Sequence, residues 1–351
     1  MALPKLFALE DCSDFSKTVE PFLPDLYALP EQLLHTLQAR ESFVDLYTRT
    51  NPLVSGFAFS LFLGAIFWVV SEINKNYSQV DRFWSILPTV YIAHFNVWAR
   101  LAGIPSHRLD GALLFSIIWS CRLTFNYARK GGYNIGSEDY RWEIVRKNIP
   151  AWLFHLFNLT FISFIQSILL FLIAAPAYPL LLSSQFESEL STADMAYVVM
   201  ELSLVLSEWF SDQQQWDYQT AKKQYQTTAK VPQGYTQAEL DRGFVTRGLW
   251  AYSRHPNFAA EQSIWLVLYQ WSCFATKTLY SWAAVGPSFL VLLFQGSTWL
   301  TELITSGKYP DYSDYQSQVG MFVPLGLGYR PSPPKQPKVI RTSELAKKQK
   351  K

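Results

Sequence analysis

Long apolar runs alternate with polar connectors along most of the chain. A helix of about 20 predominantly apolar residues crosses the roughly 30 Å of bilayer hydrocarbon, so each run is a candidate membrane span. The seven candidates are Leu53–Ser71, Phe83–Leu101, Gly111–Phe125, Ala151–Leu182, Ala193–Phe210, Phe258–Thr276 and Tyr280–Leu300. The pattern therefore predicts an all-α fold, a polytopic transmembrane helical bundle of about seven spans.

Two of these runs depart from a simple span. Phe83–Leu101 is interrupted by Pro88 and contains His94 and Asn96, which weakens its apolar character. Ala151–Leu182 is longer than one crossing needs, so we expect it to tilt or to extend to the far surface.

The two ends of the chain lack such runs. Residues 1–52 carry more Asp and Glu than Lys and Arg, and they contain no apolar run long enough for a signal peptide. We expect a soluble acidic arm with a short helix near Glu31–Arg40. Residues 329–351 are rich in proline and lysine, which predicts a disordered tail. The membrane-embedded domain is expected over residues 53–328.

The distribution of positive charge predicts the orientation in the membrane. Asn126–Asn148 and Ser211–Arg242 contain most of the lysines and arginines of the connectors. Because positively charged loops stay in the cytosol, both connectors are predicted to be cytosolic, with Ser183–Thr192 on the opposite side.

Composition supports the membrane assignment and narrows the partners. Aromatic residues make up 16% of the chain and charged residues only 17%, which is typical of a polytopic membrane protein. The net charge of +2 and the absence of a basic patch interleaved with aromatics argue against a nucleic-acid partner. Cys12, Cys121 and Cys273 are too far apart for a metal cluster, so we expect free thiols and no metal site.

Polar residues collect where the predicted spans reach the cytosol. Arg122 lies inside its span, at a cost of roughly 2.5–3.5 kcal/mol on insertion scales, and a snorkelling anchor is the alternative interpretation. The other members of this group are Asp81, Arg82, Glu208, Asp212 and the stretch Arg254–Glu261.

The stretch Gly243–Glu261 combines cations with a helix start. Pro256 suits the first position of a helix, where backbone N–H groups have no intrahelical partner and attract anions. The helix start together with Arg247 and Arg254 predicts a binding site for a phosphate-bearing cofactor. The alternative is a basic juxtamembrane anchor followed by a capped helix.

Several short motifs occur in order along the chain: Asp81–Trp84, Arg122-Leu123, Glu138–Arg141, Ser211–Gln213, Trp250–Phe258 with Glu261, Glu302, Lys308-Tyr309, Tyr312, Tyr315 and Phe322–Pro324. Together they resemble the steroid 5α-reductase and sterol-reductase superfamily, and most of all its branch known as domain of unknown function 1295. The resemblance covers roughly Leu53–Leu325. It implies a helical bundle in the endoplasmic reticulum membrane that holds NADPH at its cytosolic end and reduces a carbon–carbon double bond of a lipid.

Carried over position by position, the resemblance implies that Asn257 faces the nicotinamide amide and that Asp212 lies near the adenosine ribose. A cofactor with several phosphates also needs fixed cations, and tyrosines would close the site over them. The residues predicted to bind the cofactor are Arg122, Asp212, Arg247, Tyr252, Arg254, His255, Asn257, Lys308, Tyr309, Tyr312 and Tyr315.

One position departs from the family pattern. Steroid 5α-reductases have a tyrosine three residues before the position of Arg122, whereas this chain has Trp119. An indole cannot protonate an oxyanion, so either another acid serves or the substrate is not a 3-keto steroid. Asp81 and Glu261 are the candidate catalytic acids. The alternative role for Asp81 is a helix N-cap before Phe83.

Two other functions are compatible with the sequence. Isoprenylcysteine carboxyl and phospholipid N-methyltransferases share the Arg-His-Pro element and a nearby glutamate, and they bind S-adenosylmethionine at the same end of a similar bundle. A non-catalytic membrane scaffold is the third possibility. Asn257 and the pair Asp212-Gln213 favour the reductase.

Overall fold

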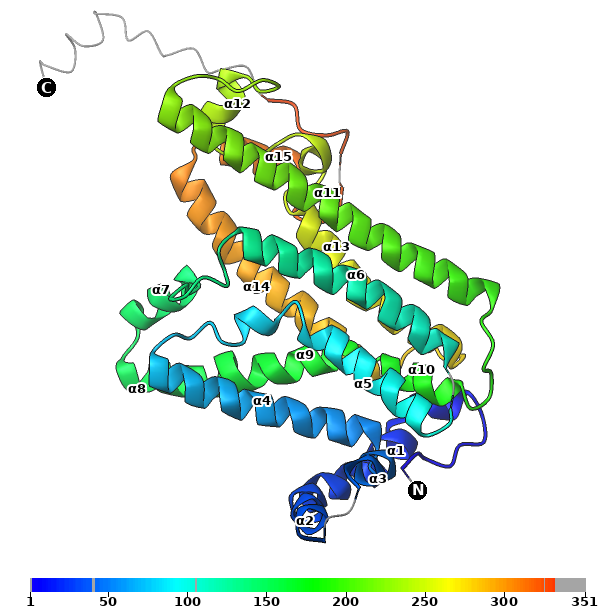
Figure 1. The fold of residues 1–351 in the computed structure, drawn as a ribbon. Coiled ribbons are helices and arrows are strands. Elements are labelled where there is room, and N and C mark those ends of the chain that lie inside the picture. The colour runs from blue at the N-terminus through cyan, green and yellow to red at the C-terminus, as the bar shows by residue number, and fades with distance from the viewer. Residues whose placement is uncertain (1, 40–41, 105, 325, 332–351) are drawn as a thin grey trace, which may run out of the picture. The chain divides into compact units, whose positions relative to one another are not determined.

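The computed structural model describes residues 2–39, 42–104, 106–324 and 326–331. Over these residues every regular element is a helix, which confirms the all-α prediction (Figure 1). The chain divides into two compact units. The first contains Met1–Gln213 and Asn257–Leu300, and the second contains Gln214–Pro256 and Thr301–Lys351.

The N-terminal arm is helical over most of its length. It contains η1 (Glu10–Ser13), α1 (Phe15–Thr18), η2 (Glu20–Phe22), α2 (Leu23–Ala39) and α3 (Phe43–Arg49). The helix predicted near Glu31–Arg40 is the second half of α2, and Arg40 lies outside the described residues. Most of the predicted C-terminal tail, residues 332–351, also lies outside them.

The first three apolar runs each form a helix in the first unit. They are α4 (Pro52–Asn74), α5 (Leu87–Leu101) and α6 (His107–Arg129), with the short η3 (Asp81–Phe83) between the first two. Asn51 caps α4 by accepting from the N–H of Leu53, and Pro52 fits the first position because its missing N–H has no role there.

The long fourth run is divided into several helical pieces. It follows α7 (Tyr140–Asn148) and consists of α8 (Ala151–Phe157), a π-helical segment η4 (Asn158–Ile165), α9 (Gln166–Ala174) and α10 (Ala177–Ser183). Figure 1 shows this run beside α4 and α5, which both contact α9. The π segment and the break before α10 mean that this run is not one uniform α-helix.

The remaining helices complete both units. They are α11 (Thr192–Thr228), α12 (Gln237–Arg242), η5 (Gly248–Ala251), α13 (Pro256–Ala275), η6 (Trp282–Ala284), α14 (Val285–Lys308) and α15 (Tyr312–Gln318).

Three described segments are long and apolar enough to cross a membrane, namely Pro52–Asn74, Ala151–Ser183 and Trp282–Lys308. This indicates an integral membrane protein in contact with lipid. The total of about seven spans, the cytosolic orientation and the endoplasmic reticulum location stay predictions.

Buried ion pairs define how α6 and α11 pack in the first unit. Near the start of both helices, Arg108 Nε lies 3.0 Å from Asp194 Oδ1. Fourteen residues further along each helix, Arg122 lies 2.7 Å from Glu208. Equal spacing on both helices means that α6 and α11 run in the same direction with a constant register.

Gly286 is required by the contact between α14 and α9. A Cβ atom there would lie 2.1 Å from the carbonyl oxygen of Leu172 and 2.2 Å from its carbonyl carbon. Because these backbone atoms cannot rotate away as a side chain can, Gly286→Ala is expected to destabilise the protein by about 3 kcal/mol, the upper end of overpacking costs.

Gly296→Ala is the control, because Gly296 lies on the same helix with open space around it. This substitution should instead stabilise the protein by roughly 0.5–1 kcal/mol. Thermal unfolding in detergent compares them, and equal melting temperatures would contradict the α9–α14 contact.

Candidate functional site

A group of charged side chains is buried in the first unit around one guanidinium. Arg122 NH2 lies 2.7 Å from Glu208 Oε2 and 3.4 Å from Glu261 Oε2, while its NH1 lies 2.8 Å from Asp212 Oδ2. The exposed fraction of these four side chains is 10% or less. With the neighbouring Asn257 they form what we call the Arg122 cluster.

Helix periodicity explains why these residues meet. Glu208 and Asp212 are four residues apart on α11, so their side chains share one face. Asn257 and Glu261 have the same spacing on α13. Pro256 is the first residue of α13, as predicted, so Asn257 lies in the first turn of that helix.

Two indoles hold the Glu261 carboxylate, each by donating to one of its oxygens. Trp119 Nε1 donates to Glu261 Oε2 at 2.8 Å, and Trp265 Nε1 donates to Oε1 at 2.9 Å. The two rings pack edge to face with their centroids 5.0 Å apart. Trp119, the residue that departs from the pattern implied by the resemblance, therefore orients a carboxylate in this chain.

The Arg122 cluster has more acidic than basic groups. One guanidinium faces three buried carboxyls, and burying unpaired negative charge is expensive. Glu208 Oε2 and Glu261 Oε2 face the same guanidinium nitrogen of Arg122, at 2.7 and 3.4 Å. A proton on one of these carboxyls would remove part of the excess negative charge. The cluster is therefore a site at which a buried carboxyl can hold a proton.

Asn257 presents an acceptor that lacks a protein partner. Its Nδ2 donates to Asp212 Oδ1 at 3.3 Å. Because a carboxylate only accepts hydrogen bonds, this contact sets the amide orientation and turns Oδ1 away from Asp212. Oδ1 is buried and has no hydrogen-bond partner among the described residues. Leaving such an atom unpaired costs about 1–3 kcal/mol, so a ligand donor fits this position.

Asp81 lies on a different segment of the first unit. It is inside η3 rather than at its N-cap, so the capping alternative is wrong. Its carboxylate accepts from Trp142 Nε1 at 2.8 Å. Burial raises the pKa of Asp81 above its usual range, and the indole N–H partly offsets this effect. Asp81 and Glu261 are thus held by separate sets of partners.

The second unit contains its own buried charge pair. Arg254 binds the Glu302 carboxylate with two nitrogens, at 2.6 Å from Nε and 3.0 Å from NH2. His255 Nε2 lies 2.9 Å from the same carboxylate, and Tyr312 and Gln316 also donate to it. Arg254 therefore already has a carboxylate partner that a cofactor phosphate would have to replace.

The predicted tyrosines of the second unit pack around Phe244. Tyr312 and Tyr315 are buried there, and burial raises the pKa of both phenols. Burial also acts on Tyr309, but the ammonium groups of Lys222 and Lys308 outweigh it and lower the pKa of Tyr309. These contacts make the tyrosines part of a packed aromatic core.

The other predicted residues of this unit are exposed. Arg247 forms a surface ion pair with Glu239 at 2.9 Å, and Tyr252 is 49% exposed. Lys308 lies over the ring of Tyr309, 5.3 Å from its centroid.

The structure thus brings together four of the predicted site residues in the first unit: Arg122, Asp212, Asn257 and Glu261. It adds Glu208, which sequence analysis placed among the clustered polar residues without a role. Its position four residues before Asp212 was the available signal. In the second unit Glu302, known only as part of a motif, is the common partner of Arg254 and His255.

Comparison with known proteins identifies the family. The model of the family described as "Protein of unknown function (DUF1295)" matches residues 67–319. An uncharacterized protein of Schizosaccharomyces pombe is 41% identical over 324 residues, which cover 92% of this chain and 93% of that protein. No solved structure matches the chain. The chain therefore belongs to the DUF1295 family.

Proposed function

We propose that this protein is a membrane-embedded reductase that uses NADPH to reduce a carbon–carbon double bond of an apolar lipid. The observation that carries the proposal is the buried Oδ1 of Asn257, which has no hydrogen-bond partner among the described residues and lies beside the carboxyls that surround Arg122. The motif resemblance supports the same cofactor and reaction class.

The residues of the Arg122 cluster fit the nicotinamide end of the cofactor. Asn257 Oδ1 offers the acceptor that a carboxamide NH2 group needs, and its Nδ2 is anchored on Asp212. Arg122 itself does not fit a phosphate, because three carboxyls already surround it.

Reduction of a double bond needs one proton in addition to the hydride that bound NADPH supplies. A proton on Glu208 or Glu261 would lie in a buried site beside Arg122, where a carboxylic acid can act as the general acid. Arg122 balances the negative charge that remains after this proton leaves. The hydrogen bonds from Trp119 and Trp265 would keep the Glu261 side chain in one orientation during the proton transfer. Glu261 is thus retained as a predicted acid, with Glu208 as its proton partner.

Ligand-induced stabilisation of the purified protein tests the proposal. NADPH at about 100 times its dissociation constant should stabilise the folded state by roughly 2.7 kcal/mol, whereas S-adenosylmethionine should not. Asn257→Ala should still bind NADPH but misplace the nicotinamide, and its rate of hydride transfer should fall by up to about 100-fold. Thermal shift and single-turnover NADPH oxidation measure the two effects.

Gln262→Ala is the matched control, because Gln262 is a buried amide on the same helix and its side chain donates to its own helix backbone, at Phe258 O, in the part of the chain that the structure describes. It should change the melting temperature without changing hydride transfer. Stabilisation by S-adenosylmethionine alone would favour the methyltransferase, and stabilisation by neither ligand would favour a scaffold.

A further inference from the structure

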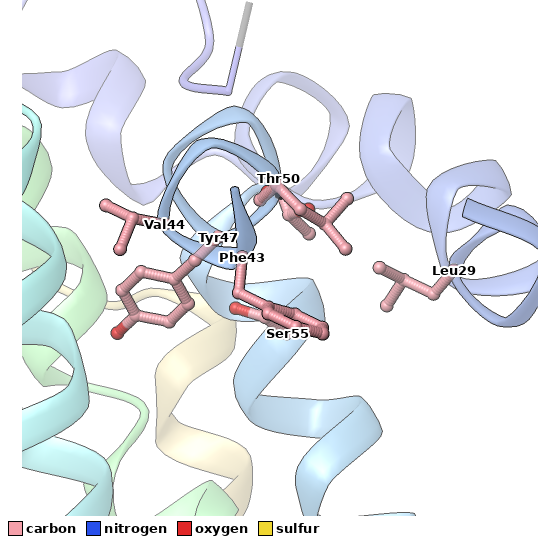
Figure 2. A pocket seen from close by; sticks show the side chains of 7 residues that line it. Leu29, Phe43, Val44, Tyr47, Thr50 and Ser55 are labelled. Atoms are coloured by element: carbon pink, nitrogen blue, oxygen red, sulfur yellow. Dashed lines mark hydrogen bonds between the residues drawn. The ribbon is translucent and has the colours of Figure 1, made fainter. Parts of the chain in front are cut away.

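A cavity of about 450 Å³ lies where the N-terminal arm meets the first long apolar helix (Figure 2). Three elements form its wall: Leu29 comes from α2, most of the other residues come from α3, and Ser55 comes from the first turn of α4. The lining residues are Leu29, Phe43, Val44, Leu46, Tyr47, Thr50 and Ser55.

The polar atoms in this wall are already satisfied by the protein. His94 Nε2 lies 2.8 Å from the carbonyl oxygen of Pro52, so this nitrogen carries the proton and Nδ1 accepts. The hydroxyl of Tyr47 therefore donates to Nδ1, at 2.7 Å. Thr50 and Ser55 hydroxyls donate to backbone carbonyls of their own helical turns. What the cavity offers a ligand is hydrocarbon surface.

The position of the cavity relates it to the bilayer. α4 is a candidate membrane span that begins at Pro52, and α3 ends three residues earlier, at Arg49. Three extended residues reach at most about 10 Å, so α3 lies close to the membrane boundary. Because Ser55 also lines the cavity, the cavity opens at the level where α4 enters the membrane.

Apolar side chains beside the cavity are exposed. Phe43 and Val44 of α3 are 55% and 53% exposed, and Leu33, Leu34 and Leu37 of α2 are exposed as well. An exposed apolar patch of this kind is unfavourable in water and is typical of helices that lie in a membrane interface.

We propose that this cavity binds one acyl chain of a membrane lipid, with α2 and α3 lying on the bilayer surface. Its volume is within the range of small-molecule pockets, and its wall matches a hydrocarbon chain rather than a polar head group. The cavity residues precede the part of the chain that the family model matches, residues 67–319. The proposal is therefore independent of the reductase chemistry.

Photo-crosslinking in reconstituted vesicles tests this site with the full-length protein. The probe is phosphatidylcholine with a diazirine near the end of one acyl chain, and labelled peptides are identified by mass spectrometry. We expect labelling of the α3 segment Phe43–Arg49 in the parent protein. Leu29→Trp places an indole in the cavity and should reduce this labelling several-fold.

Leu34→Trp is the matched control, because Leu34 is exposed on the same helix but does not line the cavity. It should leave the labelling of α3 unchanged. Val44→Trp fills the cavity from α3 and replaces Leu29→Trp if that variant does not fold. Absence of label in the parent, or equal label in cavity-filling and control variants, would overturn the proposal, since general bilayer contact would then explain the result.

Discussion

Arg122→Gln is expected to prevent accumulation of folded protein. The substitution removes the guanidinium that pairs with Glu208, Asp212 and Glu261 in the described part of the chain, so these three buried carboxyls lose that counter-charge. Removing one partner of a buried ion pair costs roughly 3–5 kcal/mol, and three partners place this variant at the upper end. Such a loss is a large part of the 5–15 kcal/mol that stabilises a typical protein.

Arg100→Gln provides the matched control. Arg100 pairs with Asp110, but their side chains are 62% and 38% exposed, so the pair contributes no more than about 1 kcal/mol. Size-exclusion profiles and melting temperatures in detergent compare the variants. If Arg122→Gln purifies and melts like Arg100→Gln, the carboxyls are not paired through Arg122 and the cluster as described is wrong.

The helices were largely predictable because their signal is local. A helix covers most of each apolar run, and the start of α13 at Pro256 follows from the chemistry of proline at a helix N-terminus. The division of Ala151–Leu182 was not predictable. Its π segment makes tertiary contacts that the local pattern does not indicate, such as the hydrogen bond from Asn158 Nδ2 to Ser71 Oγ, 87 residues away.

The residues of the site could be predicted from the sequence, but the ion pairs that they form with one another could not. Charge is costly in an apolar helix, so Arg122 and Glu261 attract attention in the sequence alone. Which carboxyl meets which cation depends on how each helix is rotated about its axis, and hydrophobic periodicity does not define that rotation closely enough. Arg254 illustrates this, because its partner Glu302 is 48 residues away.

Trp119 changes the chemistry of the site in two ways. It removes the phenol expected from the family resemblance, and its indole N–H donates to Glu261, which lies with Glu208 at the guanidinium of Arg122. Under the reductase proposal, a carboxyl of this group replaces the aromatic hydroxyl as the acid.

Glu208→Gln is expected to stop proton delivery while leaving the site intact. Glutamine keeps the shape of the side chain and can donate to Glu261 through its amide, but it has no proton to release. If the reductase proposal holds, turnover should fall by about 10²–10⁴-fold, the usual contribution of a general acid, with NADPH-induced stabilisation unchanged.

Glu201→Gln is the matched control, because Glu201 lies two turns earlier on α11 and is equally buried, with neither carboxyl oxygen hydrogen-bonded among the described residues. It should retain turnover. Steady-state rates together with thermal shift separate the possibilities: a Glu208→Gln variant that loses NADPH binding would indicate a role in the cofactor site, and one that keeps full turnover would exclude the Glu208–Glu261 pair as the proton source.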